Sequence, residues 1–496
     1  MFVGGLDVGT TGCKIAVFDE DGNNVGTYYK EYDVTRKNGL HEIDFTTVLA
    51  SVKNIIASAA KKFTLTAIGV TSFGETFGLL DENDNILTPS MLYTDPRGEN
   101  ECAELTQKLG EKCLAFKTGV RPHCMYSLPK IMWIKNNMSY AFSKAKRVLL
   151  GEDFIIYSLT GAVQIDYSLA ERTLGFNIKK KCWDSEIFAA AGIDISLMSK
   201  AVPSGSVAGV IKPEVKAELG VDYDITIVNG CHDQIAGMVG AGVFDSDIAM
   251  DGIGTVECMP IVMDEIPDDF ALYEGGYSVV PHVNGKYACY ALSFAGGSTL
   301  KWFRDTFAEY EKKLCEKSGK NVYAMLDSSI PINPTGILVL PHFAGAATPY
   351  MDSSAKAAMV GLTFEHNKFD IYKALMEGTS YEMLLNLDAL KKFIKSPSQI
   401  RATGGGATSD AWLQIKSDIL GVAITALDCK EVGAAGTALL AGMAVGFYKD
   451  MIATCNKMAM PRKAFYPDAN NHKLYTEYFA KYKGLYNAVK GLEENV

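Results

Sequence analysis

Cysteine and histidine are present, but they lack the spacing that a disulfide framework or a metal cage requires. The 11 cysteines include no Cys-x-x-Cys pair, and the 7 histidines form no ligand-spaced pair. An odd total of dispersed cysteines is typical of reduced thiols in a cytoplasm. A zinc cage is not expected.

Long hydrophobic runs are also missing. The longest apolar stretch, residues 438–447, is too short to cross a bilayer, so no membrane partner is expected. The opening Met1–Leu6 has no basic region and meets Asp7 at once. This start predicts a first strand and not a signal peptide, which favours a cytoplasmic location.

Basic residues are fewer than acidic ones. Lysine and arginine total 48 against 58 aspartate and glutamate, which gives a net charge of −10, and the basic residues form no stripe. Nucleic acid is therefore not an expected partner. Hydrophobic residues make up 48% of the chain without any low-complexity tract, which excludes extensive disorder. At 496 residues the chain exceeds what one core usually spans, so two large domains are expected.

Two glycine-threonine turns each follow an acidic residue and precede an apolar run. The first copy spans Asp7–Val17 and the second spans Asp251–Val262. Each predicts a strand, a tight turn and a returning strand. Glycine lets the backbone approach an anion, and the threonine hydroxyl and turn amides donate to phosphate oxygens. One copy alone is also typical of an ordinary β-hairpin, whereas two facing loops would hold the phosphates of one nucleotide.

The first part of the chain predicts a hairpin, a helix and buried strands. Residues 4–17 and 24–34 form the hairpin, closed by Asp21-Gly22-Asn23, and a helical pattern runs over 44–61. Residues 67–71 predict a buried strand that feeds a loop at 72–76.

A second strand repeats this arrangement. Residues 225–230 end at Cys231-His232-Asp233-Gln234, and a helix of small residues follows over 236–242. Since α/β sheets place ligands at loops beyond strand ends, both loops are candidate ligand contacts.

The predicted domain boundary lies near 242–247, where the second hairpin restarts the pattern of the amino terminus. It divides the chain into residues 1–243 and 244–496. In the second part, 336–341 predicts another buried strand and 370–393 a long helix.

A glycine-rich loop follows a strand in the second part. Residues 400–403 lead into Gly404-Gly405-Gly406, and a capped helix begins about Ser409 and runs to Leu420. A strand, three glycines and a helix start indicate a ligand loop. The alternative, a flexible connector, is weaker because the flanks are regular.

Several stretches along the chain match motifs of one family. Met125–Asn137 fits its first signature at every specified position, and Asp7–Lys14 is similar to its first phosphate loop. Residues 357–377 nearly meet its second signature, except that Leu375 stands where a smaller or branched residue is usual. Further likeness lies in Glu171–Asn177, Gly296-Gly297, Gly404-Gly405-Gly406, Trp412 and Gln414. By these motifs the chain resembles the FGGY family of carbohydrate kinases, a branch of the actin-like ATPase superfamily.

The resemblance implies a fold and a set of ligands. The fold is α/β, with two tandem actin-like (ribonuclease H-like) domains and an ATP and sugar cleft between them. Residues 1–243 would form the sugar-binding side with the first phosphate loop, and 244–496 the nucleotide-binding side. The implied cofactors are ATP and Mg²⁺, and the implied partner is a small sugar.

The resemblance also implies residue roles. ATP would bind with Thr10, Thr11 and Lys14 on one side and Gly254 and Thr255 on the other, and Gly405 and Gly406 would back the adenosine. Gly297 is also expected to contact ATP. Asp7 would hold Mg²⁺ through water. Asp233 would orient the sugar hydroxyl and accept its proton late. The alternative for Asp233 is a helix cap before Ala236.

The predicted sugar contacts are Gly74, Glu75, Asp95, Arg97, His232 and Gln234. Xylulose kinases commonly show Gln-Met-His in the first loop and Asp-Asn at the base, and this chain departs from both. Its aromatic-Gly and His-Asp pairs are more similar to the kinases of L-fuculose and L-rhamnulose. Gly74-Glu75-Thr76 also resembles the Arg-Glu-Thr of glycerol kinases with the arginine missing, which argues against glycerol.

Some interpretations stay open at this point. His232 is either a sugar ligand or a packed histidine, and Asp95 and Arg97 are either sugar contacts or a structural ion pair. The segment Met443–Phe447 fits a helix core, a partner surface or a contact in a homodimer. The predicted activity is ATP-dependent phosphorylation of a ketose, either a pentulose such as xylulose or a 6-deoxyhexulose. The alternatives are a kinase of a polyol such as glycerol or erythritol, and a non-catalytic ATP-driven switch protein.

Overall fold

The computed structural model describes residues 1–429 and 431–493, which divide into two compact units. The first unit contains Met1–Phe244, Ser278–Ala288 and Glu431–Ala459. The second contains the described parts of Asp245–Tyr277, Cys289–Lys430 and Met460–Val496. Over the described residues, none of the helices combines the length and apolarity that a membrane span needs.

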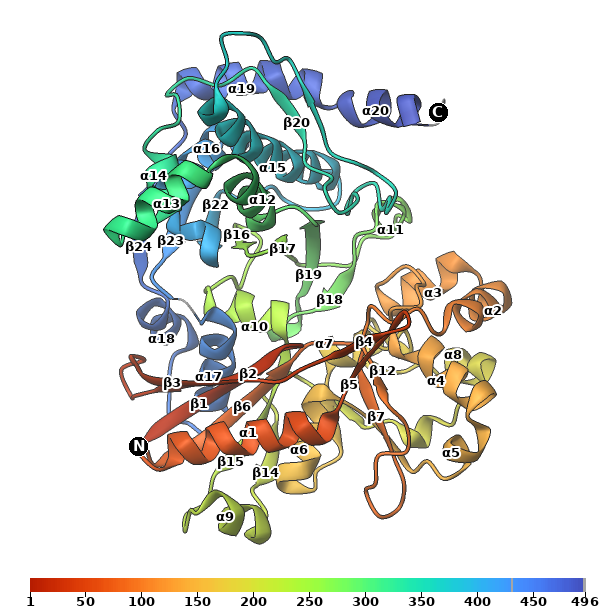
Figure 1. The fold of residues 1–496 in the computed structure, drawn as a ribbon. Coiled ribbons are helices and arrows are strands. Elements are labelled where there is room, and N and C mark those ends of the chain that lie inside the picture. The colour runs from red at the N-terminus through yellow and green to blue at the C-terminus, as the bar shows by residue number, and fades with distance from the viewer. Residues whose placement is uncertain (430, 494–496) are drawn as a thin grey trace. The chain divides into compact units, whose positions relative to one another are not determined.

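The first unit is built on a sheet with the strand order β14-β15-β6-β1-β2-β3 (Figure 1). These strands are β14 (Val207–Val210), β15 (Thr226–His232), β6 (Leu65–Ser72), β1 (Phe2–Val8), β2 (Gly12–Phe18) and β3 (Asn24–Glu31). β15, β6 and β1 run parallel, whereas β1, β2 and β3 form antiparallel hairpins. The carboxyl ends of β1, β6 and β15 therefore meet at one edge of the sheet.

Helix α1 (Phe45–Ala60) covers one face of this sheet. Asp44 caps it by accepting a hydrogen bond from the backbone N–H of Thr46 at 2.9 Å. Its buried side chains recur at helical spacing, contact β2 and share one core with Leu6 and Val8 of β1. Each buried aliphatic side chain of this kind contributes about 1.5–3 kcal/mol to folding.

Helix α17 (Val432–Ala444), far from β1 in sequence, packs against both β1 and α10 (Asp233–Gly240) (Figure 1). A Cβ atom at Gly5 of β1 would lie 1.8 Å from the carbonyl oxygen of Ala434. A Cβ atom at Gly436 would lie 2.0 Å from the carbonyl oxygen of Ala236 in α10. Only glycine allows this backbone-to-backbone approach.

The remaining elements of the first unit are short. Its helices are α2 (Glu99–Leu109), α3 (Glu111–Thr118), α4 (Ser127–Asn137), α5 (Ser139–Ser143), α6 (Gly151–Thr160), α7 (Tyr167–Glu171), α8 (Ser185–Ala191), α9 (Pro213–Leu219) and α18 (Met451–Met458). Its further strands are β4 (Thr35–Lys37), β5 (Leu40–Ile43), β7 (Phe77–Leu80), β8 (Ser90–Met91), β9 (Arg147–Leu150), β10 (Gln164–Asp166), β11 (Phe176–Asn177), β12 (Cys182–Trp183), β13 (Lys200–Val202) and β18 (Val279–Pro281).

In the second unit the strand order is β19-β17-β16-β22-β23-β24. These strands are β19 (Tyr287–Ser293), β17 (Glu257–Met263), β16 (Ile248–Ile253), β22 (Gln399–Thr403), β23 (Ala423–Leu427) and β24 (Pro461–Phe465). β16 pairs antiparallel with β17 and parallel with β22. The turn between β16 and β17 therefore lies beside the end of β22, where the three glycines begin.

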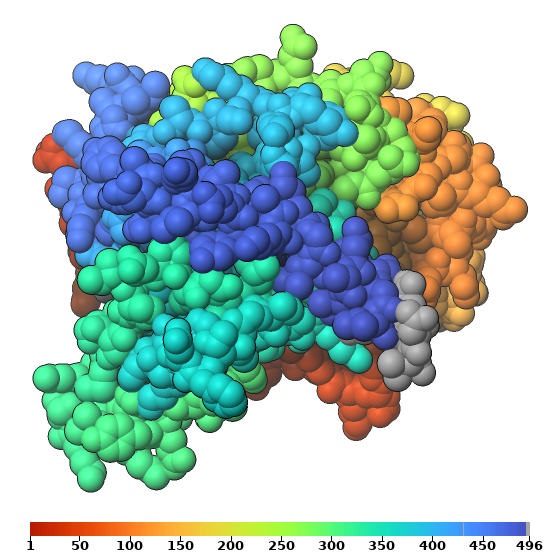
Figure 2. Space-filling view, turned by 90° about the horizontal axis from the view of Figure 1, so that it is seen from above, coloured from red at the N-terminus to blue at the C-terminus, as the bar shows by residue number. Residues whose placement is uncertain are grey.

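The helices of the second unit include one of 23 residues, α15 (Lys368–Leu390), which starts with a capping box of Asn367 and Asp370. The others are α11 (Ala271–Glu274), α12 (Gly297–Phe307), α13 (Glu309–Ser318), α14 (Val322–Asp327), α16 (Asp410–Leu420), α19 (Ala469–Tyr482) and α20 (Leu485–Glu493), and a small sheet holds β20 (Leu338–Leu340) and β21 (Ala358–Val360). Figure 2 shows the blue ridge of α19 and α20 beside the teal segment that carries β20 and β21. The ridge is fixed there by Tyr486, which stacks on Tyr350 with ring centroids 3.8 Å apart.

Most of the predicted local elements are confirmed. The structure contains the 4–34 hairpin, the helix over 44–61, both Gly-Thr hairpins and the helix capped by Ser409. One helix begins earlier than predicted: α10 starts at Asp233 and not at Ala236. A carboxylate in the first turn is favoured by the helix dipole, so the apolar periodicity alone marks the start too late.

The assignment of residues 1–243 to the sugar-binding side and of residues 244–496 to the nucleotide-binding side stays a prediction. The structure adds that Ser278–Ala288 and Glu431–Ala459 return to the first unit. The return of the second segment has a physical cause, because the small residues of α17 fit only against an equally small surface on β1 and α10.

Candidate active site

Asp233 opens α10 directly after β15, with His232 in the N-cap position. Its side chain is partly exposed, but its Oδ1 atom is buried and accepts no hydrogen bond from the described residues. Burial raises the pKa of Asp233 to about 6, although hydrogen bonds from Gln234 and the charge of Arg172 act in the opposite direction. A carboxylate with a free oxygen and a pKa close to neutrality is suited to accepting a proton.

His232 is a neutral neighbour of Asp233. Its side chain is 10% exposed, and its Nε2 atom lies 3.3 Å from Oδ1 of Asp233. Burial lowers the pKa of His232 to about 3, with a further lowering by Arg172. The imidazole therefore offers a hydrogen bond without adding a charge.

Asp7 lies near the end of β1, opposite Thr71 of β6 and Lys14 of β2. Burial raises the pKa of Asp7 to about 7, and the next largest cause is the negative charge of Asp233. The two carboxylates thus act on each other across the carboxyl ends of β1 and β15. Lys14 opposes this effect, but its ammonium group forms an ion pair with Glu431.

The first Gly-Thr turn is closed by its own backbone. The N–H of Gly9 donates to the carbonyl of Gly12 at 2.9 Å, and the Tyr32 hydroxyl donates to the carbonyl of Gly9 at 2.5 Å. Thr11 is exposed and Thr10 is half-buried at the tip. The turn therefore presents the two threonines that the sequence predicts as phosphate contacts.

The loop after β6 carries Glu75 in an unusual backbone conformation. Its φ angle is 65°, in the left-handed region, which costs a non-glycine residue about 1–3 kcal/mol. Its carbonyl accepts a hydrogen bond from the Ser127 hydroxyl at 2.6 Å. Its carboxylate accepts from Nε of Arg172 at 2.7 Å and lies 2.5 Å from Nη2 of the same guanidinium. The loop is held in place from two elements, α4 and the end of α7.

Asp95 and Arg97 form a two-point ion pair. Nε and Nη2 of Arg97 each donate to Asp95 at 2.8 Å, and Nη2 also donates to Glu42 at 2.6 Å. These hydrogen bonds from Arg97, with one from the backbone N–H of His41, lower the pKa of Asp95 against the raising effect of its partial burial. This geometry matches the alternative that Asp95 and Arg97 form a structural ion pair. A sugar contact for either residue stays a prediction.

In the second unit, the second Gly-Thr turn and the glycine loop line one pocket of about 470 Å³. It brings together five residues that the sequence assigns to the nucleotide: Gly254, Thr255, Gly297, Gly405 and Gly406. Its other walls include Asn321, Tyr323, Tyr372 and Trp412. Exposed glycine turns beside aromatic rings suit the phosphates and the flat base of a nucleotide.

Two contacts fix the second turn to α12. The N–H of Gly297 donates to the carbonyl of Gly254 at 2.8 Å, and the N–H of Ser298 donates to that of Thr255 at 3.1 Å. A Cβ atom at Gly297 would lie 2.9 Å from the oxygen of Gly254, so glycine is required there for close approach. At Gly405, by contrast, an added Cβ atom would meet no heavy atom within 4 Å.

A buried lysine braces the strands on both sides of this turn. Nζ of Lys416 lies 3.1 Å from Oδ2 of Asp251 in β16 and also pairs with Glu257 in β17, and all three side chains are 0% exposed. Burial lowers the pKa of Lys416, but the two carboxylates raise it more. The lysine is therefore charged at neutral pH and holds the hairpin that carries Gly254 and Thr255.

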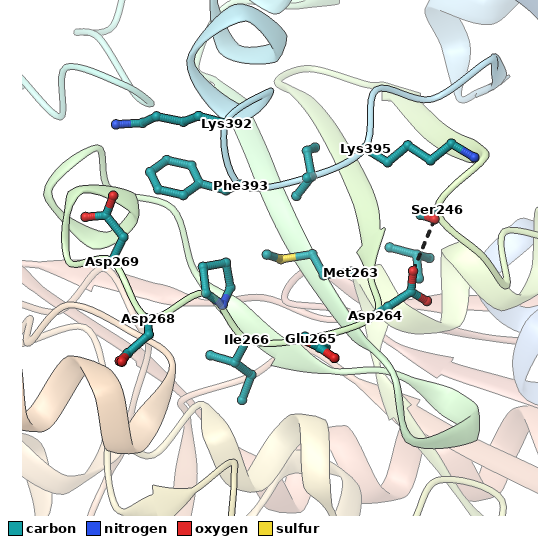
Figure 3. Close-up of a pocket in the computed structure, with 13 residues that line it drawn as sticks. Ser246, Met263, Asp264, Glu265, Ile266, Asp268, Asp269, Lys392, Phe393 and Lys395 are labelled. Carbon is teal, nitrogen blue, oxygen red and sulfur yellow. Dashed lines mark hydrogen bonds between the residues drawn. The ribbon is translucent and has the colours of Figure 1, made fainter.

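A larger hollow of about 610 Å³ in the second unit contains none of the predicted site residues (Figure 3). It lies between the segment after β17 and the segment after α15, and Lys392 and Lys395 extend to opposite sides of it. Among the labelled residues, the acidic side chains come from one segment: Asp264, Glu265, Asp268 and Asp269. Neither the residues of the two Gly-Thr turns nor Asp233 are among its lining residues.

Sequence reasoning missed several residues of the site. Arg172 falls in a stretch singled out only for its likeness, and the loop at Glu75 was taken to lack an arginine because position 74 is glycine. The structure brings a guanidinium to Glu75 from Arg172, which follows α7. The exposed Tyr93 also faces this region, since its pKa is raised by partial burial and by the charges of Glu75 and Asp233. No local sequence signal marks Tyr93, and the bracing role of Lys416 depends on contacts across 159 positions.

Comparisons with known proteins match almost the whole chain. Residues 2–240 match the N-terminal domain of the FGGY family of carbohydrate kinases, and residues 253–445 match its C-terminal domain. The chain is 28% identical to a xylulose kinase of Bacillus subtilis, with 99% of this chain and 98% of that protein covered. It is 31% identical to a glycerol kinase of Carboxydothermus hydrogenoformans, with 96% of both covered. The crystal structure of a ligand-bound xylulose kinase from Lactobacillus acidophilus superposes with a TM-score of 0.89 at 26% identity, covering 99% of this chain and 98% of that one.

Proposed function

The chain belongs to the FGGY family of carbohydrate kinases and is an ATP-dependent sugar kinase, and we propose that it phosphorylates an uncharged ketose with Asp233 as the base. The acceptor class is a pentulose such as xylulose or a 6-deoxyhexulose such as L-fuculose or L-rhamnulose. Because the chain is a kinase, the alternative function as a non-catalytic switch protein is not retained. A homodimer and a cytoplasmic location stay predictions from the sequence.

The observation that carries the proposal is the environment of Asp233. Its buried Oδ1 accepts no hydrogen bond from the described residues, although Nε2 of His232 lies 3.3 Å away, so it can accept one from a hydroxyl of the acceptor. As the hydroxyl oxygen attacks the γ-phosphorus, its proton passes to Asp233 and the bond from the γ-phosphorus to the leaving oxygen of ADP breaks. Raising the pKa of Asp233 to about 6 increases its basicity while leaving it ionised at pH 7.

The charge balance beside Asp233 supports an uncharged acceptor. The guanidinium of Arg172 is paired with Glu75 and lies 3.5 Å from Glu171, and His232 is neutral. A sugar acid would add a negative charge next to Asp233 and Glu75, where it would be repelled. Neutral hydroxyls, in contrast, can donate to Glu75 and exchange hydrogen bonds with His232 and Gln234.

The nucleotide would occupy the pocket of the second unit. Gly405, where an added Cβ atom would meet no heavy atom within 4 Å, leaves space for a flat base beside Gly406. Gly254 and Thr255 present a turn for phosphate, as the family resemblance implies. In the first unit, Thr10, Thr11 and Lys14 would contact phosphate oxygens. Lys14 would then exchange part of its pairing with Glu431 for the more highly charged phosphate.

Asp7 fits the role of a Mg²⁺ ligand. Its carboxylate is destabilised in the charged form by burial and by Asp233, and a divalent cation would relieve that repulsion. Mg²⁺ keeps several waters and commonly uses only one or two protein carboxylates, so a larger cage is not needed. When bound at Asp7, Mg²⁺ would neutralise the negative charge that develops during phosphoryl transfer.

The test is an ADP-release assay with Mg-ATP and a panel of acceptors. We expect turnover with a ketopentose or a 6-deoxyketohexose to exceed that with glycerol, erythritol and gluconate. The relatives named after xylulose and glycerol do not decide between these classes by identity alone. Preferred turnover of glycerol or erythritol would replace the ketose by the polyol, and preferred turnover of gluconate would overturn the charge argument.

A further inference from the structure

We propose that Arg172 is a positioning residue for the acceptor: its guanidinium holds the Glu75 carboxylate in place, and residue 74 is glycine because the Arg172 side chain fills the space beside it. The inference rests on the proposed role of Glu75 in contacting the acceptor. It concerns how the loop after β6 is held in place.

The ion pair is buried and has two-point geometry. The side chains of Arg172 and Glu75 are 8% and 5% exposed, and both Nε and Nη2 lie within 2.7 Å of the same carboxylate oxygen. The guanidinium also lies 5.0 Å from the centre of the Tyr126 ring. Because the ring supports one face of the guanidinium and the carboxylate meets its edge, the arginine has little freedom to turn.

The anchor of Arg172 is connected to the strand that carries Asp233. Arg172 follows α7, whose first turn is capped by Asp166 through the N–H groups of Ser168 and Leu169, both at 2.9 Å. The hydroxyl of Ser168 in turn accepts a hydrogen bond from the N–H of His232 at 2.8 Å. α7 therefore fixes the start of α10 and the partner of Glu75 at the same time.

The backbone beside Glu75 leaves space for this arginine. A Cβ atom at Gly74 would lie 2.8 Å from Cγ of Arg172 and 3.3 Å from Cδ2 of His232. Cγ lies near the base of the arginine side chain, so the clash cannot be relieved by a movement of the guanidinium alone. Alanine at position 74 should therefore displace Arg172 without removing its charge.

Without Arg172, the Glu75 carboxylate would be buried without its partner. Such a carboxylate either takes up a proton or moves toward water. In both cases the acceptor loses a fixed, charged hydrogen-bond acceptor. Lysine would restore the charge but not the planar two-point contact, so it should rescue only partly.

The experiment measures KM for the acceptor and for ATP separately in Arg172→Met, Arg172→Lys and Gly74→Ala, with whichever acceptor the wild-type enzyme prefers. We expect acceptor KM to rise about tenfold or more in Arg172→Met, as for the loss of a charged hydrogen bond, with KM for ATP within about twofold. Arg172→Lys should lie between Arg172→Met and wild type, and Gly74→Ala should behave like Arg172→Met.

Arg147→Met is the matched control. Arg147 also pairs with an aspartate, Asp84, at 3.1 Å and lies 5.0 Å from a tyrosine ring, Tyr157, but its side chain is 30% exposed, and it pairs with Leu80 at the end of β7 that is farther from Glu75. It should leave both KM values unchanged. If Arg172→Met does not fold, Gly74→Ala and Arg172→Lys decide the question.

Unchanged acceptor KM in Gly74→Ala and Arg172→Lys would overturn the proposal, and so would an equal rise in both KM values. The test of Arg172 does not depend on which class of acceptor the enzyme prefers. If wild type prefers glycerol or gluconate, the ketose assignment fails, whereas the role of Arg172 is tested with that acceptor in the same way.

Discussion

The Nε2 atom of His232 lies 3.3 Å from Oδ1 of Asp233, yet the histidine does not neutralise the carboxylate. Burial lowers the pKa of His232 to about 3 and raises that of Asp233 to about 6. At pH 7 the pair is therefore a neutral imidazole beside a carboxylate. Asp233 keeps its capacity to accept a proton, and His232 can orient a hydroxyl without competing for it.

Asp233→Asn should remove the base and retain nearly the same shape. We expect kcat to fall by about 10²–10⁴-fold, while ATP binding measured by titration calorimetry stays close to wild type. Full kinase activity in this variant would exclude Asp233 as the base. A parallel loss of ATP binding would indicate a structural role.

The pH dependence of kcat/KM should show an acidic limb. Asp233 must be ionised to accept a proton and burial raises its pKa to about 6, so activity should be retained above that pH and fall as the pH drops through about 6. Asp7, whose pKa burial and Asp233 raise to about 7, should be kept ionised by saturating Mg²⁺. The measurement is kcat/KM for the acceptor from pH 5 to 8 at saturating Mg-ATP, and a flat profile down to pH 5 would contradict the assignment.

Gly405→Ala should report on the nucleotide without disturbing the fold. An added Cβ atom meets no protein atom within 4 Å, so thermal stability should be unchanged, but the methyl group enters the pocket that we assign to ATP. We expect a penalty of about 1 kcal/mol or more in ATP binding, as for overpacking, and therefore a raised KM for ATP. Gly484→Ala is the control, since its Cβ atom would make an ordinary contact at 3.7 Å outside this pocket. An unchanged KM for ATP in Gly405→Ala would place the nucleotide elsewhere.

Lys416→Met should destabilise the second unit. The substitution leaves Asp251 and Glu257 buried without their cation, which costs about 3–5 kcal/mol when one partner of a buried pair is removed. The measurement is the free energy of unfolding of that unit in denaturant. Adding Asp251→Asn and Glu257→Gln should recover a large part of the loss, because no uncompensated charge then remains. A Lys416→Met protein as stable as wild type would show that the triad does not brace the hairpin.

The local elements of this fold follow from short-range patterns. Asp44 and Ser409 cap the helices that the sequence predicts after them, and the hairpin closed by Asp21-Gly22-Asn23 forms as expected. The five residues assigned to the nucleotide in the second part of the chain line one pocket. The caps and the hairpin turn were predictable because they depend on residues a few positions apart. The nucleotide assignment came instead from the family resemblance.

Partners across long sequence distances were not predictable in this way. Nothing local indicates that Arg172 meets Glu75 across 97 positions, that Lys14 pairs with Glu431, or that α17 returns to β1. These contacts depend on which surfaces fit once the sheets have formed, and small residues such as Gly5 act only where another backbone approaches.

By itself, the sequence determined the family, the order of the strands and turns, and the identity of the candidate base, because spacing along the chain carries that information. The tertiary structure decided the protonation of Asp233 and His232, the ion pairs of Arg172, Arg97 and Lys416, and the return of two late segments to the first unit. Burial and long-range electrostatics set these properties, and both exist only after distant parts of the chain have packed together.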